Sequence, residues 1–164
     1  MLKKTAASQK IIDNKASLPQ YNDSLWTIQQ YPALKPPPDK VQFEELINRK
    51  GINEAVQLAR QYQRIDSAAD FIHQNALNQF GRQYHAQGKS AEGLSLMQLA
   101  VEFYPQQAWL WNNLADMQEN TGNKEEAVRY SEKVTTLLAG DNGAEQSFNQ
   151  RILRSSRERL KRLK

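Results

Sequence analysis

The 164-residue chain contains no cysteine and only two histidines, His73 and His85. Without cysteine there are no disulfides, no thiolate nucleophile and no thiolate-bound metal, and the redox compartment stays undetermined. The two histidines are 12 positions apart, whereas a helical metal pair needs neighbouring turns and a nearby carboxylate. We therefore expect no metal site and no cofactor, and we interpret His85 as a solvent-facing or groove-lining side chain.

Long apolar runs are also missing, since none approaches the ~20 residues of a membrane-spanning helix. The first residues, Met1 to Lys4, carry charge, but the polar stretch from Thr5 to Lys10 follows where a signal peptide has its apolar core. The sequence thus predicts neither a membrane span nor export. The compartment stays unknown, with a cytoplasmic location as the default expectation.

Positive charge is concentrated at one end of the chain, whose formal net charge is +4. Residues 151–164 hold seven Lys or Arg against one Glu, a net +6, and residues 1–150 hold 15 Lys or Arg against 17 Asp or Glu, a net −2. The basic character therefore belongs to the C-terminal segment, not to the whole protein.

Residues 1–40 lack sustained periodicity and include the run Pro36-Pro37-Pro38, which forbids a helix through it. We interpret them as a leader or linker. From residue 41 the apolar residues recur with a helical period, which predicts a helical domain over residues 41–143. Its first part, residues 41–64, is predicted to be a degenerate hairpin that turns at Gly51.

A 34-residue repeat follows from about residue 74. Gly88 and Gly122 are 34 positions apart, and the same shift superposes Gly93 on Ala127. Each unit has a buried stripe at i, i+3, i+4 spacing, then a turn glycine, then a small residue that lets the second helix pack closely. The sequence therefore predicts an all-α array of antiparallel helical hairpins. Its two clear repeats cover residues 74–107 and 108–141.

The residues that define this pattern are Leu77, Phe80, Gly81, Tyr84, Gly88, Gly93, Ala100 and Pro105, then Trp111, Leu114, Ala115, Gly122, Ala127 and Val134. The pattern resembles the tetratricopeptide repeat (TPR) family. Three positions depart from it: Gln118 replaces the usual aromatic, Gly93 an alanine and Ser131 a large residue. The resemblance implies a TPR-like α-solenoid that acts as a non-catalytic protein-protein interaction module.

The same resemblance places candidate partner-binding residues on the first helix of each hairpin, which lines a concave groove in that family. These residues are Asn75, Asn78, Arg82, His85, Trp109, Asn112, Asp116 and Glu119. Asparagine can bond an extended peptide main chain, and Arg82 can meet a carboxylate. Trp109 is either a partner contact or a residue packed on the preceding hairpin or the leader. We expect a protein or peptide partner of unknown identity.

A broader resemblance covers residues 41–138. The segment that begins at Gly51, the segment from Ala76 to Gly81 and the run Glu102-Phe-Tyr-Pro resemble the C-terminal tail of some bacterial serine hydrolases, of β-lactamase-like or α/β-hydrolase esterase type. This implies an alternative function as a structural or regulatory accessory domain, including a dimerisation element. Homodimerisation is therefore an alternative partner prediction.

No catalytic motif is complete. Gly88-Lys89-Ser90 resembles the end of a phosphate-binding loop, but Gln83 stands where the first glycine belongs and no strand precedes it. The same segment fails the Gly-x-Ser-x-Gly pattern because Glu92 replaces its last glycine. Ser-x-x-Lys occurs nowhere in the chain. We therefore predict that the chain has no catalytic residues and is not an enzyme.

Residues 144–164 have the last helical pattern, with its arginines outside an apolar stripe. The stripe consists of Phe148, Ile152, Ser156, Leu160 and Leu163. A repeat array needs a terminal helix with one apolar and one solvated face. We predict a basic capping helix whose arginines face water. Nucleic-acid or anionic-lipid binding through this tail is the weaker alternative.

Overall fold

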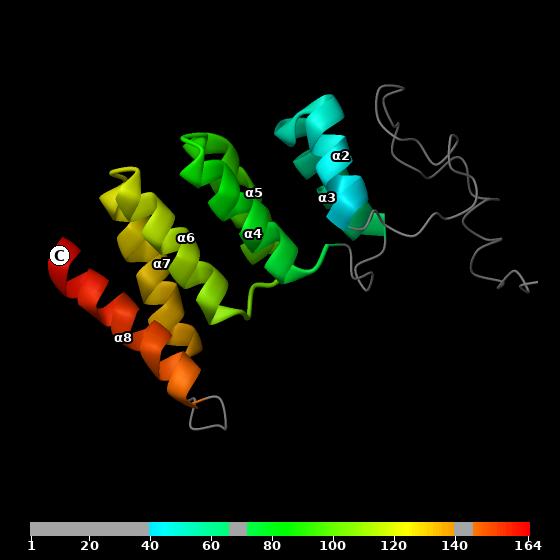
Figure 1. Cartoon of the computed structure of the whole chain (residues 1–164). Coiled ribbons are helices and arrows are strands. Elements are labelled where there is room, and N and C mark those ends of the chain that lie inside the picture. The colour runs from blue at the N-terminus through cyan, green and yellow to red at the C-terminus, as the bar shows by residue number, and fades with distance from the viewer. Residues whose placement is uncertain (1–39, 66–71, 140–145) are drawn as a thin grey trace, which may run out of the picture. The chain divides into compact units, whose positions relative to one another are not determined.

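The computed structural model describes residues 40–65, 72–139 and 146–164. These residues form seven α-helices and no strand (Figure 1). The helices are α2 (Lys40–Lys50), α3 (Ile52–Ile65), α4 (Gln74–Ala86), α5 (Ser90–Phe103), α6 (Ala108–Asn120), α7 (Lys124–Leu137) and α8 (Gln146–Leu163). All of them belong to one compact unit, residues 37–164. The predicted all-α hairpin array is confirmed, while the predicted leader lies outside the described residues except for Lys40.

Tight glycine turns join the paired helices α2–α3, α4–α5 and α6–α7. Gly51, Gly88 and Gly122 have φ angles of +87°, +80° and +84°. This left-handed region is open to glycine without the steric cost of a Cβ atom. The three predicted turn glycines are thus confirmed as helix ends.

Close packing of α4 on α5 depends on two more glycines. A Cβ atom built at Gly93 would lie 2.6 Å from the carbonyl oxygen of Gly81 and 2.9 Å from the backbone nitrogen of His85. Backbone atoms of this kind cannot move aside as a flexible side chain can. The predicted close contact at Gly93 is confirmed, and Ala127 is fully buried at the matching position.

The core stripes also follow the prediction, since Leu77, Phe80, Leu114 and Ala115 are buried. Trp111 is only partly buried. Its ring lies 5.5 Å from that of Tyr130, and its Nε1–H donates to the carbonyl oxygen of Pro105 at 2.9 Å. This bond joins α6 to the connection that follows α5.

The first hairpin packs against the second. The rings of Phe43 in α2 and Phe80 in α4 are 6.2 Å apart, and α3 contacts α5. Arg60 donates two hydrogen bonds of 2.7 Å to the carboxylate of Glu102. The degenerate hairpin thus shares the core of the array. Within the described residues, no helix is long and apolar enough to cross a membrane.

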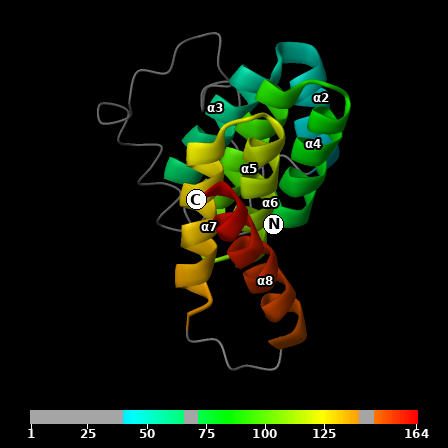
Figure 2. The same ribbon diagram turned by 90° about the vertical axis from the view of Figure 1, so that its left-hand side faces the viewer.

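Helix α8 packs on α6 and α7 (Figure 2). Ile152 joins Ala108 and Val134 in a buried cluster, and Ser156 is fully buried. Three predictions for this helix need correction. Phe148 is 44% exposed, Leu160 is only half-buried, and Arg159, predicted to face water, is 1% exposed. Arg159 is buried because α8 packs it against polar side chains of α6, which bind its guanidinium.

Candidate partner-binding surface

The eight candidate residues lie on α4 and α6, and together they define what we call the α4/α6 face. Asn75, Asn78, Arg82 and His85 belong to α4, and Trp109, Asn112, Asp116 and Glu119 belong to α6. The two helices are linked directly, since Asn113 Nδ2 donates to Asn78 Oδ1 at 2.8 Å. The two sets therefore lie on neighbouring helices, but they differ in their contacts, because among these eight residues α8 binds only members of the α6 set.

Asn112 is buried beneath α8. Its Oδ1 accepts from Ser156 Oγ at 3.1 Å and from Arg159 Nη1 at 3.2 Å. A buried amide oxygen needs such partners, because leaving it unsatisfied costs its full desolvation penalty. Here both partners come from the chain's own last helix.

Asp116 and Glu119 are also held by α8. The guanidinium of Arg159 pairs with Asp116 and donates from Nε to Glu119 Oε2 at 3.2 Å. Arg162 adds a second contact to Glu119, with its Nη2 2.7 Å from Oε1. Burial, followed by repulsion from the Arg162 guanidinium, lowers the pKa of Arg159 to about 10. The side chain therefore stays protonated at neutral pH and matches the two carboxylates.

Ser131 explains one departure from the TPR pattern. Its hydroxyl donates to the carbonyl oxygen of Ala127 at 2.8 Å and accepts from Arg159 Nη1 at 3.0 Å. A large side chain at this position would fill the space that the guanidinium occupies. The small side chain of Ser131 therefore leaves room for the buried guanidinium of Arg159, 28 positions later, and binds it.

Helix α8 takes the place that a further repeat's first helix would take. Asn78 of α4 accepts a bond from α6, and Asn112, its equivalent one repeat later, accepts bonds from α8. The same position on successive first helices therefore bonds the helix that begins the next unit, α6 for Asn78 and α8 for Asn112. In this arrangement α8 holds Asn112, Asp116 and Glu119 on the α6 part of the face. On the α4 part, Asn75 and Arg82 stay exposed.

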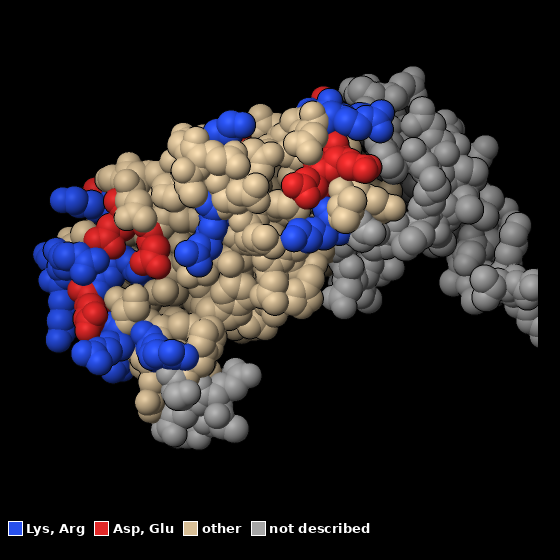
Figure 3. All heavy atoms as spheres, viewed as in Figure 1, with Lys and Arg blue, Asp and Glu red and all other residues tan. Residues whose placement is uncertain are grey.

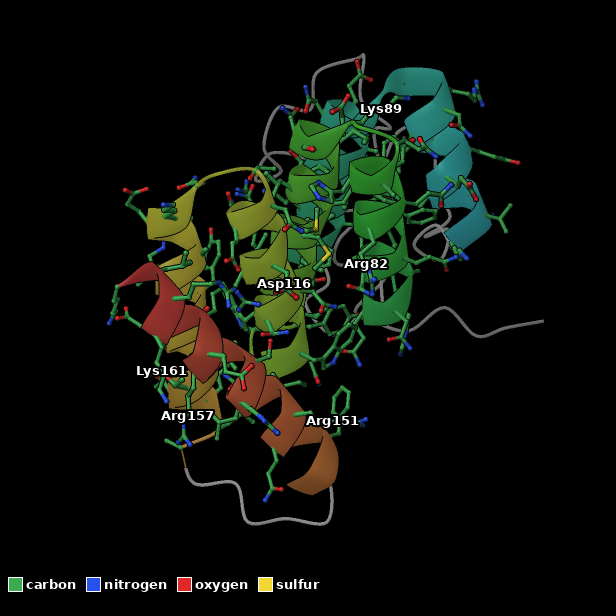
Figure 4. All side chains as sticks on the ribbon, turned by 60° about the vertical axis from the view of Figure 1, so that its left-hand side comes forward. Arg82, Lys89, Asp116, Arg151, Arg157 and Lys161 are labelled. Carbon is green, nitrogen blue, oxygen red and sulfur yellow. The ribbon has the colours of Figure 1, made fainter. Side chains whose placement is uncertain are left out.

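Asn75 and Arg82 are exposed on α4. The backbone N–H of Asn75 donates to Nδ1 of His73, which caps the helix, and the Asn75 side chain stays at the surface. Arg82 has no ion pair within the described residues, although its equivalent on α6, Asp116, has one. Figure 4 shows Arg82 on α4, Asp116 on α6 and α8 beside α6.

His85 and Trp109 are both half-buried. His85 packs by its backbone against Gly93 of α5, and its Nδ1 is buried without a hydrogen-bond partner in the described part of the chain. Trp109 packs on the cluster of Ala108, Val134 and Ile152. It therefore leans toward α7 and α8, and it also lines a cleft of about 620 Å³.

The outer side of α8 carries the excess positive charge. Lys and Arg side chains gather at the end of the array formed by α7 and α8 (Figure 3). Arg154 pairs with Glu158 at 3.0 Å and Lys164 with Glu132 at 2.6 Å. Arg157 and Lys161, which Figure 4 labels on α8, have no ion pair with any described residue. The tail's basic residues thus divide into an inner set that fixes α8 and an outer set in solvent.

Sequence reasoning missed Arg159, Ser131 and Ser156 as parts of this surface. The departure at Ser131 was a usable signal, because a small residue at a position that is normally large leaves space for a partner. Among the described residues, no group of three or more His, Asp or Glu side chains is arranged to hold a metal ion.

Residues 96–129, which run from within α5 to within α7, match the tetratricopeptide repeat family. Among solved structures, the chain is similar to the crystal structure of MamA protein, with 14% sequence identity over 75% of this chain and 68% of that chain and a TM-score of 0.40. No curated protein sequence matches the chain.

Proposed function

The chain carries tetratricopeptide-type repeats, and we propose that it binds a peptide or protein partner on the part of the α4/α6 face that α8 leaves open. Helical-repeat folds of this kind serve as interaction scaffolds. The observation that supports this site is the contrast between equivalent positions. Asp116 on α6 is satisfied within the fold, whereas Arg82 on α4 is exposed and has no ion pair in the described residues.

The chemistry of this open surface favours an extended segment with an acidic group. The amide of Asn75 can donate to and accept from a peptide main chain. Arg82 can hold a carboxylate through two parallel hydrogen bonds, which fixes orientation as well as charge. The expected partner therefore presents an Asp, Glu or terminal carboxylate near exposed main chain.

Affinity capture with the purified chain tests this proposal when it is run with two charge-reversal variants. Arg82→Glu should lose the captured partner, because it places a carboxylate where the partner's acidic group binds. Lys133→Glu makes the same charge change on the exposed side of α7 and should capture it normally. Equal capture by both variants would contradict the site. A captured serine hydrolase or second copy of the chain would favour the accessory-domain alternative.

We also propose that the chain is not an enzyme. Three of the described side chains that hydrolytic chemistry could use are engaged in the fold: His73 caps α4, and the hydroxyls of Ser131 and Ser156 donate to Ala127 and Asn112. We expect the chain to hydrolyse p-nitrophenyl acetate no faster than a non-enzymatic control protein of similar size and charge. Turnover that disappears on substitution of one particular serine would show the opposite.

A further inference from the structure

The cleft beside Trp109 lies where three helices begin and one ends. Gln74 is at the start of α4, Gln107 precedes α6, Phe148 is near the start of α8, and Leu138 follows α7. Its volume of about 620 Å³ is within the ~300–1,000 Å³ of typical ligand sites. The cleft is therefore large enough for a side chain together with its adjoining main chain.

The described part of the cleft's lining carries no charged side chain. The described lining residues are of two kinds. Apolar side chains include Trp109, Leu137 and Phe148, and neutral amides include Gln74 and Gln107. A charged ligand group would lose its hydration here without gaining a counter-charge from these lining residues. A cation outside the lining, the guanidinium of Arg151, lies 6.0 Å from the centroid of the Phe148 ring. Phe148 is 44% exposed, so a large apolar surface lies open at the same place. The lining thus fits a neutral ligand with an apolar part.

Gln74 supplies an acceptor that the fold does not use. Its Oε1 is buried and has no hydrogen-bond partner among the described residues. A buried acceptor of this kind is costly to leave unmatched. Across the cleft, Gln107 gives α6 no side-chain cap, so N–H groups of the first turn of α6 lack a side-chain acceptor. An amide group, which has both a donor and an acceptor, complements these two positions.

We propose that this cleft binds an uncharged stretch of a partner peptide through one large apolar side chain. The side chain lies between Trp109 and Phe148, and the Gln74 amide, whose Oε1 is buried in the free chain, turns to accept a hydrogen bond from a main-chain N–H of the peptide. This inference rests on the proposed function and extends it, because it assigns an anchor residue to the same partner. The acidic group that Arg82 recognises lies outside the cleft.

The test uses the full chain, labelled with 15N, and N-acetyl-phenylalanine amide as a neutral probe with one aromatic side chain. We expect a saturable shift of the Trp109 indole N–H signal, because the probe ring lies beside it. The Trp111 indole should stay in place, since it is bonded to Pro105. N-acetyl-glycine amide, which lacks the side chain, should produce no saturable shift. Absence of a saturable shift with the aromatic probe would overturn the proposal.

Two variants separate binding from folding. Gln74→Met keeps the length of the side chain but removes the acceptor, so probe affinity should fall roughly two- to tenfold while the melting temperature stays level or rises. Phe148→Ala should weaken binding, and Val41→Ala, at the exposed hydrophobic of α2, should not. Unchanged affinity in both cleft variants would overturn the proposal.

Partner capture distinguishes failure of this inference from failure of the proposed function. If Arg82→Glu loses the partner while Gln74→Met and Phe148→Ala capture it normally, the anchor site is wrong and the proposed function stands. If capture needs none of these residues, both are wrong. Concentration-dependent dimerisation that Phe148→Ala abolishes would instead assign the cleft to a second copy of the chain and overturn the peptide proposal.

Discussion

At the scale of single residues, Arg159 shows how a charged side chain can be part of the core. Its guanidinium bonds Asn112 and Ser131 and pairs with Asp116 and Glu119. The side chains of the two carboxylates keep 48% and 23% of their exposure, so they stay partly hydrated. The ion pairs of Arg159 with Asp116 and Glu119 therefore gain hydrogen bonds without the full desolvation cost of a completely buried ion pair.

Arg159→Ala should destabilise the fold. Removing one partner of a fully buried pair costs ~3–5 kcal/mol, and the partial hydration of Asp116 and Glu119 lowers the expected loss to about 2–3 kcal/mol. Arg157→Ala, on the solvent side of the same helix, should change the free energy of unfolding by less than ~0.5 kcal/mol. Urea unfolding of both variants measures the difference. Equal midpoints would mean that the Arg159 network does not hold α8.

Gly93 and Gly81 allow a sharper comparison, because the same substitution meets different neighbours. A Cβ at Gly93 meets backbone atoms, whereas a Cβ at Gly81 meets mainly the flexible Met97 side chain, with Cγ 2.6 Å away. Gly93→Ala should therefore cost ~1–3 kcal/mol through overpacking, more than the ~1 kcal/mol that alanine gains in helix propensity. Gly81→Ala should lower the melting temperature less. The reverse order would contradict the packing of α4 on α5.

At the scale of helices, the sequence predicted most of what local pattern decides. The turn glycines, the hairpins and the core position of Ile152 followed from period and residue size. Arg159 did not, because its burial depends on Asn112 and Ser131, which lie in other helices. Phe148 fitted the apolar stripe of α8 by spacing, yet it lies near the helix start and is 44% exposed. Periodicity assigns a face to a residue, and tertiary contact decides whether that face is covered.

The candidate surface was predictable only in part for the same reason. Family resemblance placed all eight residues on α4 and α6, and this placement needs no knowledge of α8. Which of them stay open depends on where the last helix packs. Asn112 and Asp116 bond α8, whereas Asn75 and Arg82 do not. A single-sequence pattern contains no information on that docking, except for the small residue at Ser131.

The apolar face of α8 can be tested by two truncations of unequal burial. Ile152 belongs to the buried cluster with Ala108 and Val134, whereas Leu160 is half-buried. Ile152→Ala should cost about 2–3 kcal/mol, within the ~2–5 kcal/mol of buried aliphatic truncations. Leu160→Ala should cost less, because fewer of its contacts are lost. Thermal unfolding gives both values, and a larger loss at Leu160 would place the contact face of α8 elsewhere.

At the scale of the whole array, α8 decides where the repeats end. In a linear repeat array each unit contacts only its neighbours, so the last hairpin depends on a terminal helix to cover its open side. Here α8 covers Val134 and the buried amide of Asn112 and neutralises Asp116 and Glu119. The basic residues of α8 fall into two sets. Arg159 and Arg162 bind carboxylates of α6, and Arg157 and Lys161 are exposed to solvent.

Deleting residues 144–164 should therefore destabilise the helices that remain. The deletion exposes the Val134 cluster and leaves two carboxylates on α6 without their guanidinium partners. We expect a lower urea midpoint, and α6 and α7 should lose hydrogen-exchange protection before α4 and α5. As a control, Arg154→Gln with Arg157→Gln removes outer charges only and should change stability by ~0–1 kcal/mol. If the tail were instead a nucleic-acid arm, the deletion would leave the midpoint unchanged and abolish a salt-sensitive affinity for RNA. The bonds from Arg159 and Ser156 into the array argue for the first result.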